Sequence, residues 1–241
     1  MAVTFDVLRA TTTLVHAFAH GALEVRAFAS PEAARAEAVR PHSAGSLLCG
    51  ERAGLRVEGF DLGNSPAEYV GRAVAGRRLL FASTNGAPAL VATAGARHQI
   101  LAAFVNLGAA VERCLALLAH EPSLSDEAWG GDEIWLVCAG KDGAPSAEDA
   151  ACAAAFLDRL AIRLEERGGA LDAAEAGAVL RPYRLPPRGD LFTFLAATEH
   201  GRELAGLGPA FVDDLRAAAA LDVLSAVPEG RGGVLGPGPG A

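Results

Sequence analysis

The sequence predicts an α/β fold in which helices cover both faces of a mainly parallel β-sheet, with a mixed sheet as the alternative. Two observations lead to this fold class. Short apolar runs alternate with alanine-rich amphipathic stretches along most of the chain, and hydrophobic residues make up 51% of the 241 residues. The chain is therefore long and apolar enough for one domain with a sizeable core.

The predicted strands are short apolar runs bounded by polar or glycine-containing segments. They cover Ala2–Phe5, Glu24–Phe28, Ser46–Cys49, Arg78–Ala82, Gln99–Val105 and Glu133–Ala139, with a last candidate at Leu221–Val227.

The segments between these runs predict helices near Ala10–His20, Pro31–Val39, Pro66–Ala73, Ala87–Thr93 and Ala109–His120. After Ala139 the pattern becomes mostly helical, with Ser146–Arg167, Asp190–His200 and Pro209–Ala220. Ser65–Glu68 has the pattern of a capping box, and Ser146 resembles another helix start. Either cap can be purely structural.

The remaining segments predict loops and a tail. Glu121–Gly131 and the proline-rich Arg181–Gly189 are predicted loops. We interpret residues 1–228 as a single domain and the glycine- and proline-rich residues 229–241 as a disordered tail.

Charge and composition exclude several classes of protein. The net charge of −8 provides no general basic surface for nucleic acid, and Lys141 is the only lysine. The longest uncharged run, Leu79–Ala96, is interrupted by polar residues and proline, so no membrane span is expected. The four cysteines form no CxxC pair, which favours reduced thiols in a cytoplasmic protein. A homo-oligomer is an open expectation.

Polar residues collect where the predicted strands end, which is where open α/β sheets bind ligands. The strand ends are followed by Asp6, Arg9 and Thr11–Thr13; by Glu51, Arg52 and the loop Gly59–Ser65; by Ser83–Gly86; by Asn106; and by Cys138–Gly143, Ser146, Glu148 and Asp149. Helix N-termini and arginines suit an anion, and carboxylates suit a hard cation such as Mg²⁺. A phosphate ester with Mg²⁺ would use all three features.

Each of these features also has a structural explanation. An aspartate after a strand is often a helix cap, Asn85-Gly86 is often a plain turn, and Glu51-Arg52 can form a surface ion pair. The usual phosphoryl-transfer signatures, such as GxxxxGK[ST], are absent, and the six histidines are scattered. His16 and His20 share a helical face, and we favour a structural role for them.

Five segments, in this order, resemble the 2-phosphosulfolactate phosphatase family. They are Asp6–Thr13, Gly50–Arg52, Gly59–Pro66, Thr84–Gly86 and Val137–Gly140, followed by Ser146-x-Glu148-Asp149-x-x-Cys152-Ala153. The resemblance implies a three-layer α/β/α sandwich and a Mg²⁺-dependent acid phosphatase that acts on 2-phosphosulfolactate and related 2-hydroxy-acid phosphates. The product, sulfolactate, is an intermediate of coenzyme M synthesis in methanogens.

Several positions depart from the family pattern. The chain begins almost at the first motif, where family members have a preceding segment. The family's Thr-Arg after Asn-Gly is replaced by Ala87-Pro88, and a family threonine by Lys141. We expect these changes in loops at the rim of the site. Lys141 is either solvated or a substitute for the lost arginine.

The expected site residues follow from the motifs and strand ends. Mg²⁺ ligands are expected among Asp6, Glu51, Glu148 and Asp149. Catalysis is expected to involve Asp6, Arg9, Glu51, Arg52, Asn85 and Cys138, with Asp6 the favoured nucleophile and Cys138 more consistent with a buried thiol. Contacts with a small anionic phosphate ester are expected from Thr11, Thr12, Asp61, Asn64, Ser65, Thr84, Gly86, Asn106, Gly140 and Lys141. The alternative is a non-catalytic member that binds an anionic metabolite or a protein.

Overall fold

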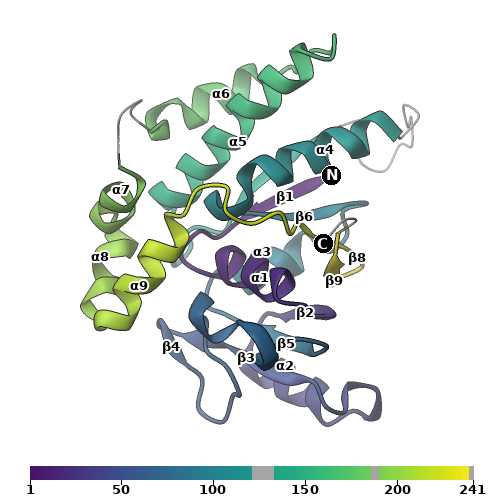
Figure 1. The fold of residues 1–241 in the computed structure, drawn as a ribbon, viewed down its shortest axis with the longest axis vertical. Helices are drawn as coiled ribbons and strands as arrows, with labels where there is room; N and C mark the ends of the chain where they lie inside the picture. The colour runs from purple at the N-terminus through teal and green to yellow at the C-terminus, as the bar shows by residue number, and fades with distance from the viewer. Residues whose placement is uncertain (121–132, 186–189, 239–241) are drawn as a thin grey trace.

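The computed structural model describes residues 1–120, 133–185 and 190–238 (Figure 1). Its strands are β1 (Ala2–Phe5), β2 (Glu24–Phe28), β3 (Leu47–Arg52), β4 (Leu55–Arg56), β5 (Arg78–Ala82), β6 (Gln99–Ala102), β7 (Trp135–Cys138), β8 (Pro228–Arg231) and β9 (Val234–Pro237). Its α-helices are α1 (Ala10–Ala19), α2 (Pro31–Ala38), α3 (Gly86–Ala92), α4 (Leu107–His120), α5 (Ala147–Glu165), α6 (Ala174–Leu180), α7 (Leu191–Ala197), α8 (Glu199–Gly206) and α9 (Pro209–Ala218). The fold class is α/β, as predicted.

The strands described form one sheet in the order β4-β3-β5-β2-β9-β8-β6-β1-β7. The pairs β1–β6, β1–β7, β2–β5 and β3–β5 are parallel. The pairs β2–β9, β3–β4, β6–β8 and β8–β9 are antiparallel. The prediction of a mainly parallel sheet is therefore wrong, because half of the strand pairings are antiparallel and the sheet is mixed.

The antiparallel pairings come mainly from the C-terminal hairpin β8–β9, which joins the two parallel halves of the sheet. Gly232 and Gly233 have φ of +61° and +79° and form the two-residue turn between Arg231 and Val234. Glycine adopts these angles at little cost, so the glycine pair permits the tight hairpin. The predicted disorder after Pro228 is wrong for residues up to Pro237, and residues 239–241 lie outside the described residues.

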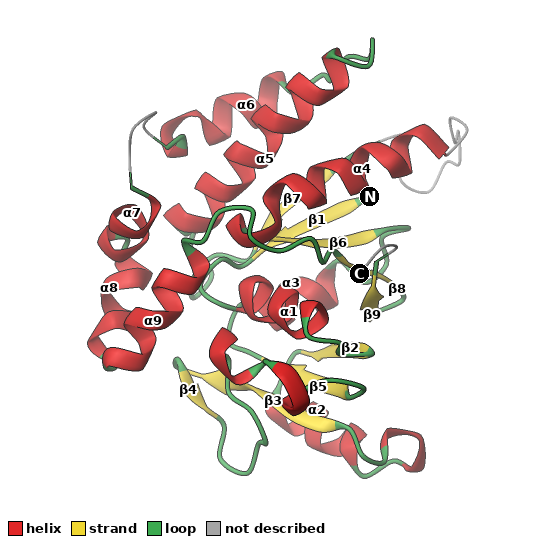
Figure 2. Ribbon diagram, viewed as in Figure 1, coloured by secondary structure: helices red, strands yellow, loops and turns green. Residues whose placement is uncertain are grey.

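Helices lie on both sides of the sheet, with α1 and α4 in front and α2 and α3 behind it in the view of Figure 2. One core cluster packs β1 and β6 against α4 and α5 and includes the edge-to-face pair Phe5 and Phe156. A second cluster packs α1 and α3 against β2 and β5. The full burial of β1 agrees with its place between β6 and β7 and with its apolar sequence.

Several predicted elements differ in detail. Residues 66–73 form two short 3₁₀ helices, Pro66–Glu68 and Gly71–Ala73, instead of one α-helix. The predicted helix Asp190–His200 is divided into α7 and α8, because the Thr198 hydroxyl caps a new helix by accepting a hydrogen bond from Gly201 N. Residues 221–227 form no strand. The predicted loop Glu121–Gly131 lies outside the described residues.

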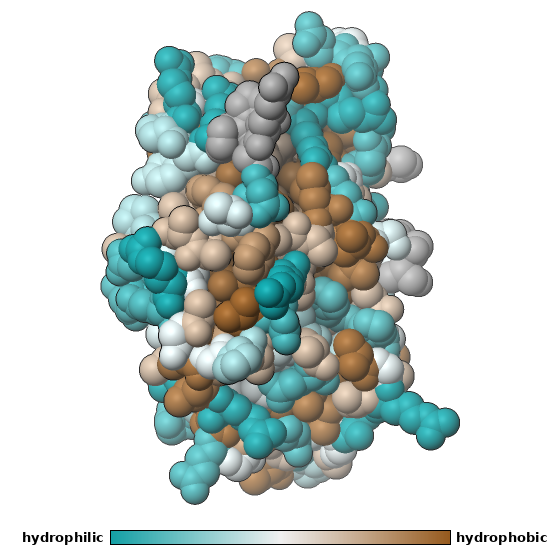
Figure 3. Space-filling view, turned by 60° about the vertical axis from the view of Figure 1, so that its left-hand side comes forward, coloured by the Kyte–Doolittle hydropathy of each residue, from teal (hydrophilic) through white to brown (hydrophobic). Residues whose placement is uncertain are grey.

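The side of the molecule that carries α7, α8 and α9 adjoins the ends of β1, β3 and β5 (Figure 1). Figure 3, turned to bring this side forward, shows hydrophobic side chains interspersed with hydrophilic ones across it. No helix within the described residues is long and apolar enough to cross a membrane.

Candidate active site

A pocket of about 320 Å³ opens at the carboxyl ends of β1, β3 and β5 and is bordered by α8. It brings together side chains from segments far apart in the sequence. Of the residues selected from the sequence, the pocket lining includes Asp6, Arg9, Glu51, Arg52, Asn64, Thr84, Asn85 and Lys141. The pocket therefore lies where strand ends in α/β folds usually bind ligands.

Asp6 follows β1 directly and is held in place by the first turn of α1. Its Oδ1 accepts a hydrogen bond from Ala10 N at 3.1 Å, and its main chain exchanges two hydrogen bonds with the Thr11 hydroxyl. Burial raises the pKa of Asp6 to about 6. The charge of His200 and the Ala10 hydrogen bond act in the opposite direction, and the charges of Glu51 and Glu148 add to the rise.

Gly86, the first residue of α3, allows α3 to approach Asp6 closely. A Cβ at this position would lie 2.3 Å from Asp6 Oδ2 and 2.4 Å from Ala10 Cβ. Gly86 is therefore a spacer beside Asp6, and the glycine is required there by close approach rather than by substrate contact.

Glu51, at the end of β3, is fixed by three donors. Its Oε1 accepts from Thr84 N at 2.6 Å, and its Oε2 accepts from Gly54 N at 2.7 Å and from the Thr84 hydroxyl at 3.2 Å. These bonds tie β3 to the residues after β5. The carboxylate lines the pocket, but most of its hydrogen-bonding capacity is already used.

Glu148 and Asp149 begin α5 and are both buried. Asp149 Oδ1 accepts from Val7 N at 2.8 Å and its Oδ2 from Gly140 N at 3.0 Å, so both oxygens bind the main chain. Burial, reinforced by the charge of Asp6, raises the pKa of Asp149 well above its usual value. The role of Asp149 is to join the loops after β1 and β7, whereas Glu148 has an oxygen to spare.

His200 is a pocket residue that the sequence analysis missed. It belongs to α8, and its Nδ1 lies 3.0 Å from Glu148 Oε1. Burial lowers the pKa of His200, but the hydrogen bond and charge of Glu148 and the charges of Asp6 and Asp149 outweigh it, so the pKa is raised overall. No sequence spacing links His200 to its partner 52 residues earlier, so only the fold reveals the pair.

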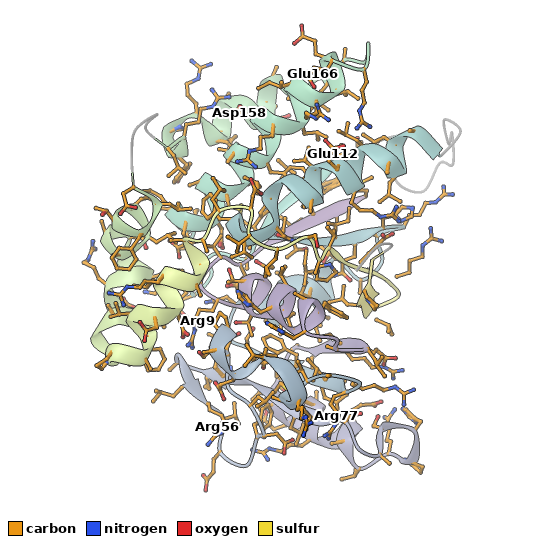
Figure 4. All side chains as sticks on the ribbon, viewed as in Figure 1. Arg9, Arg56, Arg77, Glu112, Asp158 and Glu166 are labelled. Carbon is orange, nitrogen blue, oxygen red and sulfur yellow. The ribbon has the colours of Figure 1, made fainter. Side chains whose placement is uncertain are left out.

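Arg9 is engaged in a buried ion pair. Its Nη1 donates to Asp214 Oδ2 at 2.6 Å and its Nη2 to Gly54 O at 2.6 Å, and its guanidinium lies over the Phe211 ring. Figure 4 shows Arg9 between α9 and the β3–β4 region. The Ser65 hydroxyl donates to the other oxygen of Asp214. Arg9 and Ser65 thus anchor α9, and their predicted catalytic and substrate-binding roles stay predictions.

Six further residues selected from the sequence serve the fold in this structure, so their predicted catalytic and substrate-binding roles stay predictions. Thr12 donates to Val7 O, Asn106 bonds Ala103, Leu101 and Ala226, and Asp61 accepts from Leu48 N. Thr11 is fully buried, Gly140 makes a turn with φ of +71°, and Cys138 lies outside the pocket lining. Burial, followed by the charge of Asp149, raises the pKa of the Cys138 thiol to about 12, which disfavours a nucleophilic thiolate.

The replaced family positions Ala87 and Pro88 lie in the first turn of α3 rather than in a rim loop. Ala87 is fully buried and its N donates to the Ser83 hydroxyl at 2.8 Å. Neither residue lines the pocket. The expectation that this change lies in a loop at the rim is therefore wrong for Ala87 and Pro88.

Three polar side chains face the pocket from other elements. Asn64 is 4% exposed, and its amide makes no hydrogen bond within the described residues. Arg52 is exposed and makes no hydrogen bond or ion pair in the described part of the chain. Asn85 Oδ1 accepts from Asp142 N at 3.0 Å. Of these three side chains, Asn64 and Arg52 are therefore the ones without a hydrogen bond in the described residues.

Two neighbouring buried carboxylates, Asp6 and Glu148, each with an unused oxygen, provide a donor set suited to Mg²⁺. Asp6 Oδ2 and Glu148 Oε2 accept no hydrogen bond within the described residues. Mg²⁺ is usually bound through one or two carboxylates, water and substrate phosphate oxygens. No three histidine, cysteine, aspartate or glutamate residues are grouped for a metal within the described ranges. A Mg²⁺ site here would thus consist of these two carboxylates completed by water and substrate.

Comparison with known proteins gives the family. The family model described as 2-phosphosulpholactate phosphatase matches residues 1–233. The chain belongs to this family. Members of the 2-phosphosulfolactate phosphatase family are phosphoric monoester hydrolases by their description.

Curated relatives align over nearly the whole chain. A protein of Synechococcus sp. (strain JA-2-3B'a(2-13)) is 40% identical over 227 residues, covering 94% of this chain and 87% of its own. A protein of Gloeobacter violaceus is 38% identical, covering 94% and 86%, and one of Prochlorococcus marinus (strain MIT 9313) is 37% identical, covering 94% and 87%. Each relative is named "Probable 2-phosphosulfolactate phosphatase".

Proposed function

We propose that this protein is a Mg²⁺-dependent phosphatase that hydrolyses the phosphate monoester of a small 2-hydroxy acid, such as 2-phosphosulfolactate, to the hydroxy acid and phosphate. The observation that carries the proposal is the position of Asp6. This carboxylate lies at the end of β1, in the pocket, with one oxygen that accepts no hydrogen bond in the described part of the chain and with Glu148 and His200 near it. The family membership and the relatives' names support the same reaction.

The pocket suits a small anionic ester in size and in chemistry. Its volume of about 320 Å³ is at the lower end of the range for small-molecule sites. The Asn64 amide and the Arg52 guanidinium can donate hydrogen bonds to phosphoryl or carboxylate oxygens. His200, oriented through Nδ1 by Glu148, leaves Nε2 without a partner in the described part of the chain and can donate to an ester oxygen.

Asp6 and Glu148 are the residues that would hold Mg²⁺. When bound, the ion would supply positive charge against the phosphoryl oxygens. Within the pocket lining, acidic side chains (Asp6, Glu51, Asp142, Glu203) slightly outnumber basic ones (Arg9, Arg52, Lys141) before His200 is counted. An added cation would therefore favour a doubly charged ester at a site that is otherwise short of free positive charge.

The test is phosphate release from a panel of 2-hydroxy-acid phosphates, with Mg²⁺ titrated from zero. We expect turnover of at least one ester, lost on chelation and restored by Mg²⁺. Binding of an ester without turnover by the Mg²⁺-loaded protein would contradict the proposal and favour the non-catalytic alternative. Turnover that is indifferent to chelator would overturn the Mg²⁺ part alone.

A further inference from the structure

Lys141 is held at the pocket by two carboxylates of α8. Its Nζ lies 2.8 Å from Glu203 Oε1 and 3.0 Å from Glu199 Oε1. Lys141 comes from the loop after β7, so these ion pairs cross the mouth of the pocket, and Lys141 and Glu203 both belong to its lining. Lys141 is 19% exposed and so is not the freely solvated side chain that one interpretation of the sequence expected.

Glu199 and Glu203 reverse the charge that Lys141 alone would give to the side of the pocket formed by α8 and the loop after β7. One ammonium and two carboxylates sum to a charge of −1, because one positive charge is set against two negative ones. Next to them the wall is apolar: Leu204 and Leu207 line the pocket, and the Leu207 side chain packs against Gly54 in the β3–β4 turn. An acidic group placed on this side would meet negative charge and hydrocarbon.

The other cations of the lining are largely committed. Arg9 is paired with Asp214, and the charge of His200 is offset by Glu148, although His200 Nε2 stays available to the phosphate ester. Arg52 remains, although its charge also acts on Glu32 outside the pocket. Arg52 can pair with one acidic group of a substrate besides the phosphate, and a second such group has no matching cation in the described lining.

From this arrangement we infer that Glu199 and Glu203 are specificity determinants: by holding Lys141 they make the pocket prefer esters of 2-hydroxy acids with a single carboxylate over esters that carry a second strong acid such as a sulfonate. The inference rests on the proposed function and refines its substrate class. In chemical terms, 2-phospholactate, which lacks the sulfonate, is the better substrate than 2-phosphosulfolactate.

The experiment compares kcat/KM for these two esters, at low ionic strength and with Mg²⁺ present, in Glu199→Gln, Glu203→Gln and the double variant. Glutamine keeps the size and the hydrogen bond but removes the charge. We expect the sulfonate/lactate ratio of kcat/KM to rise about two- to five-fold for each carboxylate removed, the range typical of exposed charge pairs. The gain should shrink as salt is added. Glu175→Gln on α6, an exposed residue outside the pocket lining, is the charge-matched control and should leave the ratio unchanged.

Lys141→Met separates a freed lysine from a general change in charge. In the wild-type background Lys141→Met should lower the ratio, because it leaves two unpaired carboxylates. In the Glu199→Gln/Glu203→Gln background, Lys141→Met should cancel most of the rise in the sulfonate/lactate ratio. The Lys141 ammonium, released from the two glutamates, is the group that causes this rise. An unchanged ratio in the double variant, or a wild-type preference for the sulfonate, overturns the inference while the phosphatase assignment stands. Failure to hydrolyse either ester overturns the phosphatase assignment, and the inference with it.

Discussion

Nδ1 of His200 lies 3.0 Å from Oε1 of Glu148, which joins the first turn of α5 to the middle helix of the α7–α9 group. Glu148 is 1% exposed, and among the described residues its carboxylate is partnered by the His200 side chain alone, which leaves Oε2 for the proposed metal. Glu148→Gln keeps an acceptor for His200 but loses the charge. We expect the apparent Mg²⁺ affinity, measured by titrating Mg²⁺ against phosphate release, to fall about 10- to 100-fold.

The matched control for this variant is Glu112→Gln, which removes a surface carboxylate paired with Arg163 and Arg167 far from the pocket (Figure 4). Its Mg²⁺ titration should coincide with that of the wild type. If Glu148→Gln gives the same curve as Glu112→Gln, Glu148 is not a metal ligand.

Asp6→Asn removes the charge of the central carboxylate while keeping its shape. The amide oxygen can still accept the hydrogen bond from Ala10 N, and one buried negative charge near Glu51 and Glu148 is lost. We expect a folded protein with unchanged or higher thermal stability and turnover reduced by about 1,000-fold or more, as for the loss of a group that acts on the reacting phosphoryl. Retained kcat would show that Asp6 is neither a metal ligand nor a nucleophile.

Gly86→Ala tests the close approach of α3 to Asp6. The added methyl group would lie 2.3 Å from Asp6 Oδ2 and 2.4 Å from Ala10 Cβ, so the helix or the carboxylate must move. We expect a loss of about 1–3 kcal/mol in the free energy of unfolding, with activity falling further because Asp6 is displaced. Gly95→Ala, where a Cβ meets nothing within 4 Å, is the control and should be near neutral. Equal stability of the two variants would show that α3 can move away at no cost.

Asp214→Asn should destabilise the protein because it leaves the Arg9 guanidinium buried without its counter-charge. Arg9 and Asp214 are 4% and 2% exposed. Breaking such a pair usually costs about 3–5 kcal/mol. The neighbouring Asp213→Asn breaks an exposed pair with Arg216 and should cost less than about 1 kcal/mol. Urea unfolding of both variants measures the difference, and equal midpoints would contradict a structural role for the buried pair.

The sequence predicts several parallel strands well and the C-terminal hairpin poorly, for physical reasons. The predicted bounds of β1, β2 and β5 are confirmed: β1 and β5 are mostly apolar and buried, and in β2 the apolar residues Val25 and Ala27 alternate with the polar residues Glu24 and Arg26. Gly232-Gly233 carries a hairpin signal, but the surrounding glycines and prolines resemble a disordered tail in composition. The pairing of β8 with β6 and of β9 with β2, which joins residues far apart in the sequence, holds that segment in the sheet.

The site could be located from the sequence but not assigned in detail. Asp6 and Glu51 follow strands, so their common position at the pocket follows from sheet topology. The commitment of Arg9 to Asp214 depends on a contact across 205 residues, and that of Lys141 to Glu199 on one across 58. A motif shows which residues occur near a site, whereas packing of distant helices decides which of them remain free to bind a ligand.

A last prediction concerns the stability of α1 against acid. Burial lowers the pKa of His16, and the charge of His20, whose ring is stacked on it, lowers this pKa further. His16 Nε2 is buried without a hydrogen-bond partner in the described structure. The unfolded chain, with an ordinary histidine pKa near 6.5, therefore binds a proton at a pH where the folded chain does not. Stability from this residue is complete above about pH 6.5 and is lost as the pH falls through the folded pKa.

His16→Gln removes this proton linkage. The difference in melting temperature between variant and wild type should therefore shift in favour of the variant as the pH is lowered from 7.5 to about 5, because only the wild type must protonate His16 on unfolding. His20→Gln removes the charge repulsion on His16 but leaves His16 buried. Its curve of melting temperature against pH should therefore lie between those of the wild type and of His16→Gln. The wild type and the variants share all other titrating groups, so the effects of those groups on the melting temperature cancel in the difference. A constant difference across this pH range would show that His16 titrates alike in the folded and unfolded chains.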